Sequence, residues 1–178
     1  RNWTAGTVYD IYRHDYGEYT TGSTSVRKTS NSGATTLFDS NFYVLSSARN
    51  VYKCLDNNGG ATSTDEPTGV STSVITTTDS YKWKFMYTLS AAQQANFLST
   101  DFMAVSPNSN PGSDQSNVMS AAVNGAIDIV KIKSAGSGGT AGTFTNIPIR
   151  GDGSGGLATV VVGGGQITSV TVTTPGTG

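Results

Sequence analysis

The chain has 178 residues, a formal net charge of −1 at pH 7, and charged side chains at only 13% of its positions. Its 11 lysines and arginines are spread thinly, which excludes a basic surface able to neutralise several phosphates, so we expect no nucleic-acid partner. No apolar run approaches the roughly 18 residues needed to cross a bilayer, so we also expect no membrane span.

Hydroxyl side chains and glycine dominate the composition, with 26 threonines, 22 serines and 22 glycines. Threonine favours strands because its branched Cβ suits a pleated surface, whereas glycine and serine supply the turns between strands. The composition therefore predicts an all-β fold. Cys54 is the only cysteine, which excludes an internal disulfide and a cysteine-based zinc site; we expect a small buried hydrophobe.

Residues 1–110 contain both tryptophans, all eight tyrosines and five of the six phenylalanines, and should form the larger core. The clearest strand is 81–87, because its residues alternate strictly between aromatic and other side chains. This alternation places Tyr81, Trp83, Phe85 and Tyr87 on one face, and Lys82, Lys84 and Met86 on the other. Shorter runs of β-branched and aromatic residues predict strands at 8–12, 42–45 and 51–55.

One short helix is predicted directly after the strand at 81–87. Ser90 stands three residues before Gln93, the spacing at which each side chain bonds the other residue's backbone N–H. Ala95, Phe97 and Leu98 follow and give the segment apolar side chains. We expect two to three helical turns here and no other helix.

A run of turn-forming residues at 106–114 contains no apolar side chain, as is typical of a linker or an exposed loop. We therefore expect a first, β-sandwich-like domain over 1–110, a linker over 111–123, and a second domain over 124–178.

The second domain contains an internal repeat, because the pattern of residues 124–132 returns forty residues later at 164–172. Strands are expected at 143–149, 157–162 and 167–173, separated by glycine-rich turns. We expect a Gly-rich β-repeat (meander) module. The chain stops at the counterpart of the turn after Ile132 and lacks an initiator methionine, so we expect an excised fragment whose repeat module is truncated at its end.

We expect structural roles for several residues whose side chains could act as bases, metal ligands or paired carboxylates. His14 adjoins Asp15 but is the only histidine, so we expect a surface or turn residue rather than a base or ligand. Asp65 and Glu66 are adjacent, and neighbours in an extended chain point to opposite sides, so a shared carboxylate site is not expected.

The glycine-rich loops also resemble catalytic motifs only in part. The loop 151–156 is followed by a valine-rich segment rather than by Lys-Ser/Thr and a helix, which favours a turn over a phosphate site. Ser137 and Ser154 lie between predicted strands, not at a strand-to-helix turn. The sequence therefore predicts no catalytic, cofactor-binding or metal-binding residue, no cofactor, and a protein that is not an enzyme.

Three segments in order carry a resemblance to a known family. They are the segment 52–56 with Tyr52, Cys54 and Asp56, the segment 67–69 with Pro67 and Gly69, and the segment 79–86 with Asp79, Tyr81 and Trp83. The chain over about 1–110 resembles the gene 8 baseplate wedge subunit family of large contractile-tailed phages. Ser80 replaces the glycine of that family's motif. Residues 124–178 are similar to the Gly- and Thr-rich β repeats of structural proteins from phages of marine cyanobacteria.

The resemblance implies a mainly β, non-catalytic structural virion protein that dimerises, or forms a higher assembly, and binds other baseplate wedge or tail proteins. It also implies assembly in the host cytoplasm and a final location in the tail baseplate. Two alternatives remain. One is a carbohydrate-binding adhesin or tail-fibre module that uses the aromatic strand 81–87; the other is a tail part associated with a cell-wall hydrolase.

Overall fold

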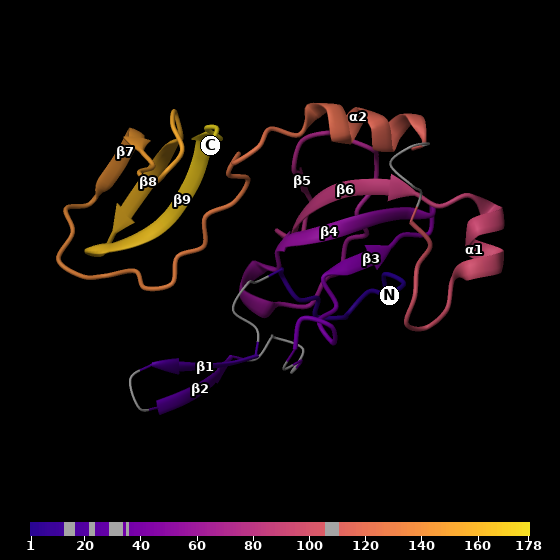
Figure 1. Ribbon diagram of the computed structural model, residues 1–178. Coiled ribbons are helices and arrows are strands. Elements are labelled where there is room, and N and C mark those ends of the chain that lie inside the picture. The colour runs from indigo at the N-terminus through magenta and orange to yellow at the C-terminus, as the bar shows by residue number, and fades with distance from the viewer. Residues whose placement is uncertain (13–16, 22–23, 29–33, 35, 106–110) are drawn as a thin grey trace. The chain divides into compact units, whose positions relative to one another are not determined.

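The computed structural model describes residues 1–12, 17–21, 24–28, 34, 36–105 and 111–178. Its contacts divide the chain into two compact units, Arg1–Ala121 (unit 1) and Ala122–Gly178 (unit 2), which are described separately. Antiparallel strands make up most of the regular structure of both units (Figure 1). The expected all-β class is confirmed at this coarse level.

Unit 1 contains a four-stranded antiparallel sheet in the order β3-β4-β6-β5. The strands are β3 (Tyr43–Leu45), β4 (Asn50–Asp56), β5 (Ile75–Thr76) and β6 (Lys82–Thr88). The predictions at 42–45, 51–55 and 81–87 are thus confirmed as β3, β4 and β6. A separate hairpin pairs β1 (Gly17–Thr21) with β2 (Thr24–Lys28), and a short 3-10 helix, η1, spans Asn58–Gly60.

The strand predicted at 8–12 is wrong, because these residues join no sheet although Tyr9 and Asp10 are fully buried. Side chains replace the missing ladder partners. The backbone N–H of Tyr9 donates to the hydroxyl of Tyr81 at 3.3 Å, and Nδ2 of Asn57 donates to the carbonyl of Tyr9 at 2.9 Å. The segment is therefore a loop that is buried at Tyr9 and Asp10 and exposed at Tyr12.

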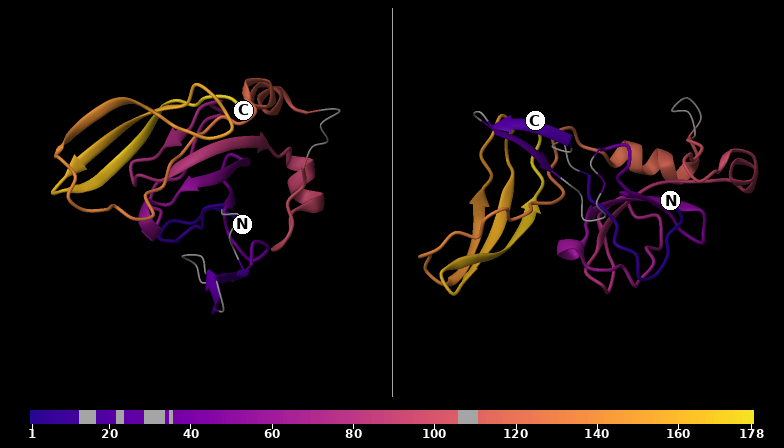
Figure 2. Two further views of the ribbon diagram at one scale, coloured as in Figure 1. Left: turned by 60° about the vertical axis from the view of Figure 1, so that its left-hand side comes forward. Right: turned by 90° about the horizontal axis from the view of Figure 1, so that it is seen from below.

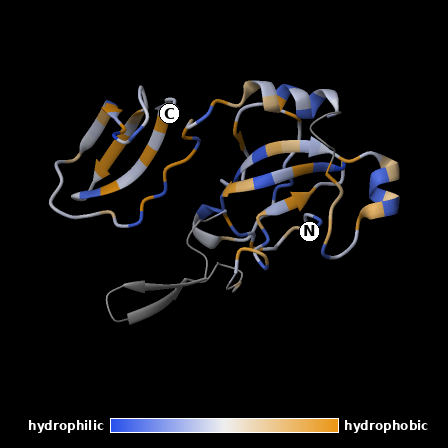
Figure 3. Ribbon diagram, viewed as in Figure 1, coloured by the Kyte–Doolittle hydropathy of each residue, from blue (hydrophilic) through white to orange (hydrophobic). Residues whose placement is uncertain are grey.

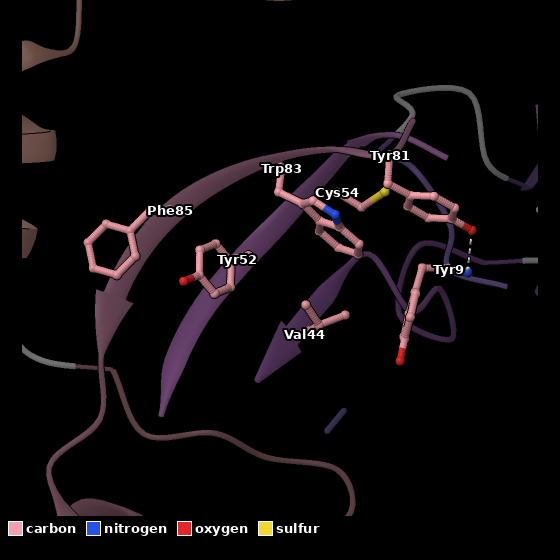
Figure 4. Packing of buried hydrophobic residues seen from close by; sticks show 7 residues of the cluster. All are labelled: Tyr9, Val44, Tyr52, Cys54, Tyr81, Trp83 and Phe85. Atoms are coloured by element: carbon pink, nitrogen blue, oxygen red, sulfur yellow. Dashed lines mark hydrogen bonds between the residues drawn. The ribbon is translucent and has the colours of Figure 1, made fainter. Parts of the chain in front are cut away.

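The core of unit 1 lies on one face of the sheet. Figure 4 shows its seven buried side chains, which are Tyr9, Val44, Tyr52, Cys54, Tyr81, Trp83 and Phe85. Cys54 has no exposed surface and lies opposite Trp83 in the register of β4 and β6, which confirms the prediction of a small buried hydrophobe. Figure 3 shows both hydrophilic and hydrophobic bands along β4 and β6. In β6 the buried residues Trp83 and Phe85 alternate with the half-buried Lys82 and Lys84, as expected when one face of the strand faces this core.

The aromatic alternation of β6 breaks before its end. Val51 pairs with Tyr87 whereas Tyr52 pairs with Phe85, so Met86 is an extra residue in the ladder. Such a bulge reverses the side-chain direction beyond it. Tyr87 therefore packs with a second cluster, built on Leu45, Val51 and Leu89, and its predicted place beside the other three aromatics is wrong.

Two short helices complete unit 1, where the sequence predicted one. α1 (Ala91–Phe97) has the predicted capping box: Ser90 Oγ accepts from the N–H of Gln93, and Gln93 Oε1 accepts from the N–H of Ser90. α2 (Ser113–Ala121) occupies most of the segment expected to be a linker. It lies beside β6 in Figure 1 and Figure 2, and its Val118 packs against the core. This tertiary contact stabilises a helix that local composition did not indicate.

Unit 2 is a three-stranded antiparallel meander in the order β7-β8-β9. Its strands are β7 (Gly142–Pro148), β8 (Leu157–Gly163) and β9 (Gln166–Thr174), close to the three predicted ranges. The two copies of the sequence repeat differ in structure, since 164–172 enters β9 whereas 124–132 forms no strand. Instead a backbone bond from Ile127 N to Pro175 O holds the first copy near the end of β9, and a bond from Ile167 N to Ala135 O holds the segment that follows the copy.

Candidate functional site

The aromatic strand offers no ring surface for a ligand. Tyr81, Trp83 and Phe85 each have 0% exposure. The Trp83 ring stacks on Tyr81 with centroids 5.4 Å apart and meets Tyr9 edge-on at 5.7 Å, as the close view shows (Figure 4). The indole is thus enclosed in the core, and its Nε1 is buried without a hydrogen-bond partner among the described residues. The core interpretation of these three residues is confirmed.

Asp79 is the most heavily bonded carboxylate among the described residues. Burial alone would raise its pKa, but hydrogen bonds from Thr77 and from three backbone N–H groups hold the pKa below its ordinary value. The carboxylate accepts five hydrogen bonds. Three are to Oδ2, from Ser63 Oγ at 3.0 Å, Thr64 N at 2.8 Å and Asp65 N at 3.1 Å. Two are to Oδ1, from Thr77 Oγ1 at 2.5 Å and Tyr81 N at 3.2 Å. The carboxylate therefore ties the loop at 63–65 to the turn that starts β6.

Asp65 and Glu66 bond two different loops. Oδ2 of Asp65 accepts from the N–H and the hydroxyl of Thr78, both at 2.8 Å. Glu66 accepts from the N–H of Ser47 at 2.7 Å and from its hydroxyl at 2.8 Å. Each carboxylate closes a loop, so the prediction that the pair does not share one site is confirmed.

The phenol of Tyr81 joins three segments of unit 1. It accepts from the N–H of Tyr9 at 3.3 Å and donates to the carbonyl of Ala61. Burial raises the pKa of Tyr81 to about 12, although the hydrogen bond from Tyr9 acts in the opposite direction. A phenol held in its neutral form by burial serves as a structural hydrogen-bond donor at neutral pH.

The segments 52–56, 67–69 and 79–86 meet around β4 and β6. The hydroxyl of Tyr52 donates to the carbonyl of Gly69 at 2.7 Å, and Pro67 in the same loop is fully buried. Gly69 has φ of 83°, and Ser80 has φ of 64°. Both values lie in the left-handed region that glycine adopts without strain. The motif residues therefore have packing and turn-forming roles.

In unit 2, the glycine-rich loop 151–156 connects β7 to β8, as expected for a turn. A Cβ placed on Gly153 would lie 2.5 Å from the carbonyl oxygen of Thr177, and one on Gly176 would lie 2.9 Å from the oxygen of Ser154. Ser154 and Thr177 exchange two backbone hydrogen bonds, at 2.7 and 2.9 Å. Close packing of the chain on itself thus explains these glycines. The loop also lines a cleft of about 250 Å³.

The remaining sequence candidates are not brought together into a site. Ser137 and Ser154 are exposed, and neither precedes a helix. His14 lies outside the described residues. Within the described ranges, no group of three or more His, Cys, Asp or Glu side chains is placed to hold a metal ion.

A second cleft, of about 280 Å³, lies in unit 1 where the end of β6 and the start of α1 meet the first turn of α2. Its lining consists of Thr88, Ser90, Gln93, Gly112, Ser113, Asp114 and Gln115. Gln115 is only 8% exposed. Sequence analysis did not identify this cleft, and no sequence pattern marks it, because its two walls are about twenty residues apart in the chain and both are ordinary polar segments.

No described helix is long and apolar enough to cross a membrane. Searches against protein-family models, curated protein sequences and solved structures found no match to this chain.

Proposed function

We propose that this chain is a structural virion protein of a contractile phage tail, acting as a baseplate wedge component through protein–protein assembly. The proposal includes a sandwich-like wedge domain over 1–110 and a Gly-rich β-repeat module over 124–178. The expected linker over 111–123 is not part of it, because α2 packs on the core of unit 1. Other baseplate wedge or tail proteins are its partners, and it forms a homodimer or a higher assembly.

One observation carries the proposal. The residues on which the proposed resemblance to the wedge family rests lie in three separate segments, and these segments contact one another in unit 1. Cys54 pairs with Trp83, and Tyr52 bonds to Gly69. Ser80, the one departure from the family motif, adopts the left-handed conformation that a glycine would adopt. Because these roles all concern packing and turns, the motif supports a shared architecture rather than a shared chemistry.

Exposed apolar side chains support an assembly role. Phe97 is 63% exposed, and Phe102 and Val105 are each 68% exposed. All three lie in α1 or the segment after it, while neighbouring Leu98 and Met103 pack inward on the second cluster of unit 1. Large exposed apolar side chains that lie close along the chain are typical of surfaces that a partner covers.

Particle composition tests the proposal. Mass spectrometry of purified contractile-tailed particles encoded by the genome of origin should find the chain in the tail fraction and not in the capsid fraction. Phe102→Ser should reduce its incorporation without unfolding unit 1, whereas Phe144→Ser, at a residue 42% exposed in unit 2, serves as the matched control. Absence of the chain from tails, together with a monomeric state in solution, would refute the proposal.

The full burial of Tyr81, Trp83 and Phe85 argues against the alternative in which this aromatic strand binds a glycan. No observation favours the hydrolase-associated alternative.

A further inference from the structure

Gln115 in α2 is buried, yet none of the described residues is hydrogen-bonded to its side-chain amide. The residue is only 8% exposed, but its amide atoms are not among those fully removed from solvent. Gln115 lines the 280 Å³ cleft of unit 1. An amide to which no protein group bonds keeps its donor and acceptor capacity for water or for a ligand in the cleft.

Among the described residues, the lining of the cleft is polar. Thr88, Ser90 and Gln93 form one wall, and Ser113, Asp114 and Gln115 form the other, with Gly112 between them; these described residues contribute no apolar side chain. Its volume corresponds to about nine water molecules at roughly 30 Å³ each. An apolar ligand would leave these groups unpaired, so the ligand must itself be polar.

The hydrogen bonds that Thr88 and Ser90 make within the protein determine which of their donors and acceptors remain for a ligand. Oγ of Ser90 accepts from the N–H of Gln93 at 3.1 Å, which leaves its proton to donate. The Thr88 hydroxyl donates to Oδ1 of Asn50 at 2.7 Å, which leaves its lone pairs to accept. Donor and acceptor capacity therefore both remain on this wall.

The opposite wall adds the carboxylate of Asp114, an acceptor, and the amide of Gln115, which both donates and accepts. The lining offers little to an ion. An anion would be repelled by Asp114. A metal ion would find a single carboxylate, because no group of three or more His, Cys, Asp or Glu side chains among the described residues is placed to hold one.

We propose that this cleft binds a neutral, hydroxyl-rich ligand of monosaccharide size, that is, a single sugar residue. Each sugar hydroxyl both donates and accepts, which matches the mixed wall. With no aromatic ring for stacking, a ligand of about twelve heavy atoms should bind with a dissociation constant of about 1 mM. The inference does not depend on the assembly role, since it concerns a different surface.

An NMR titration of the full 178-residue chain tests the inference, with methyl glycosides of glucose, galactose, mannose and N-acetylglucosamine as probes. At least one glycoside should give saturable shifts of the Gln115 side-chain NH₂ and of the backbone amides of Ser113 and Asp114. Gln115→Leu keeps the volume but removes the amide, and should weaken binding at least about tenfold. Asn117→Leu, at an exposed position two residues further along α2, should leave binding unchanged.

Three results would overturn the inference: shifts that do not saturate with any glycoside, shifts that persist in Gln115→Leu, or saturation by inorganic phosphate or acetamide without saturation by a sugar. The last result would assign the cleft to an anion or to an amide. If circular dichroism shows that Gln115→Leu is unfolded, Asp114→Asn replaces it; that variant removes only a charge on a half-buried side chain and should weaken sugar binding severalfold.

Discussion

Unit 1 and unit 2 are both antiparallel sheets rich in threonine, but they differ in what holds them together. Among the described residues, every buried apolar side chain except Ala158 lies in unit 1. Unit 2 has the ladder hydrogen bonds of three strands and tightly packed glycine turns, with β7 exposed along its whole length. In unit 2 strand propensity is enough to form a sheet, whereas in unit 1 large aromatic side chains also form a core.

The largest effect should come from removing the centre of that core. Trp83→Ala should lower the free energy of unfolding of unit 1 by about 3–5 kcal/mol, because a fully buried indole is lost. Phe144→Ala, at the single phenylalanine of unit 2, should cost less than about 1 kcal/mol because that ring is 42% exposed. Urea unfolding followed by Trp3 fluorescence for unit 1, and by valine methyl signals for unit 2, measures both. Similar costs at the two positions would contradict the comparison.

The features that could be predicted from sequence are those that depend on neighbours in the chain. The alternation of 81–87 indicated β6, and the spacing of Ser90 and Gln93 indicated the start of α1. The direction of Tyr87 could not be predicted, since the bulge at Met86 depends on the register with β4. α2 was missed for the same reason, because Val118 packs on residues far away in the sequence.

The bonded carboxylates illustrate the same limit. Asp79 follows Thr77 at a spacing typical of local side-chain turns, so its bond to that residue is visible in the sequence. Its bonds to Ser63 and Thr64 span 16 and 15 residues and depend on where the loop folds back. The amide of Gln115 likewise acquires its surroundings only when α2 packs beside β6.

Loss of the Asp79 charge should have the next largest effect. Asp79→Asn turns one acceptor oxygen into a donor that faces N–H or O–H groups, and should lower the free energy of unfolding of unit 1 by about 2 kcal/mol. Asp152→Asn, at an exposed loop position of unit 2, should change stability by less than about 0.5 kcal/mol. Urea midpoints at pH 7 compare the two. If Asp79→Asn lowers the free energy of unfolding no more than Asp152→Asn does, the Asp79 carboxylate does not have this structural role.

Alkaline pH should destabilise unit 1 selectively. Burial raises the pKa of Tyr81 to about 12, whereas in the unfolded chain the phenol ionises near its ordinary value of 10.0. The folded state thus keeps a proton that the unfolded state loses, so stability is complete below pH 10 and falls as the pH rises towards 12. Unit 2 contains no tyrosine.

Urea midpoints between pH 8 and the onset of alkaline unfolding, followed by tryptophan fluorescence, measure this decline. Tyr81→Phe removes the ionisation, so its midpoint should fall less steeply with pH than that of the unchanged chain, even if it starts lower. Parallel curves for the two proteins would show that other groups cause the alkaline loss.

The smallest expected effect concerns Ser80, in the turn before β6. Ser80 has φ of 64°, a conformation that costs a residue with a Cβ roughly 1 kcal/mol and that glycine adopts freely. Ser80→Gly should therefore stabilise unit 1 by about 0.5 kcal/mol, once the greater freedom of glycine in the unfolded chain is subtracted. Ser169→Gly in β9, where the backbone has no positive φ, should instead destabilise unit 2 by about 0.5–1 kcal/mol. Opposite signs for the same substitution would show that the turn before β6 favours glycine, as we expect from the proposed wedge architecture. A loss of stability at both positions would mean that the hydroxyl of Ser80 contributes more than its backbone strain costs.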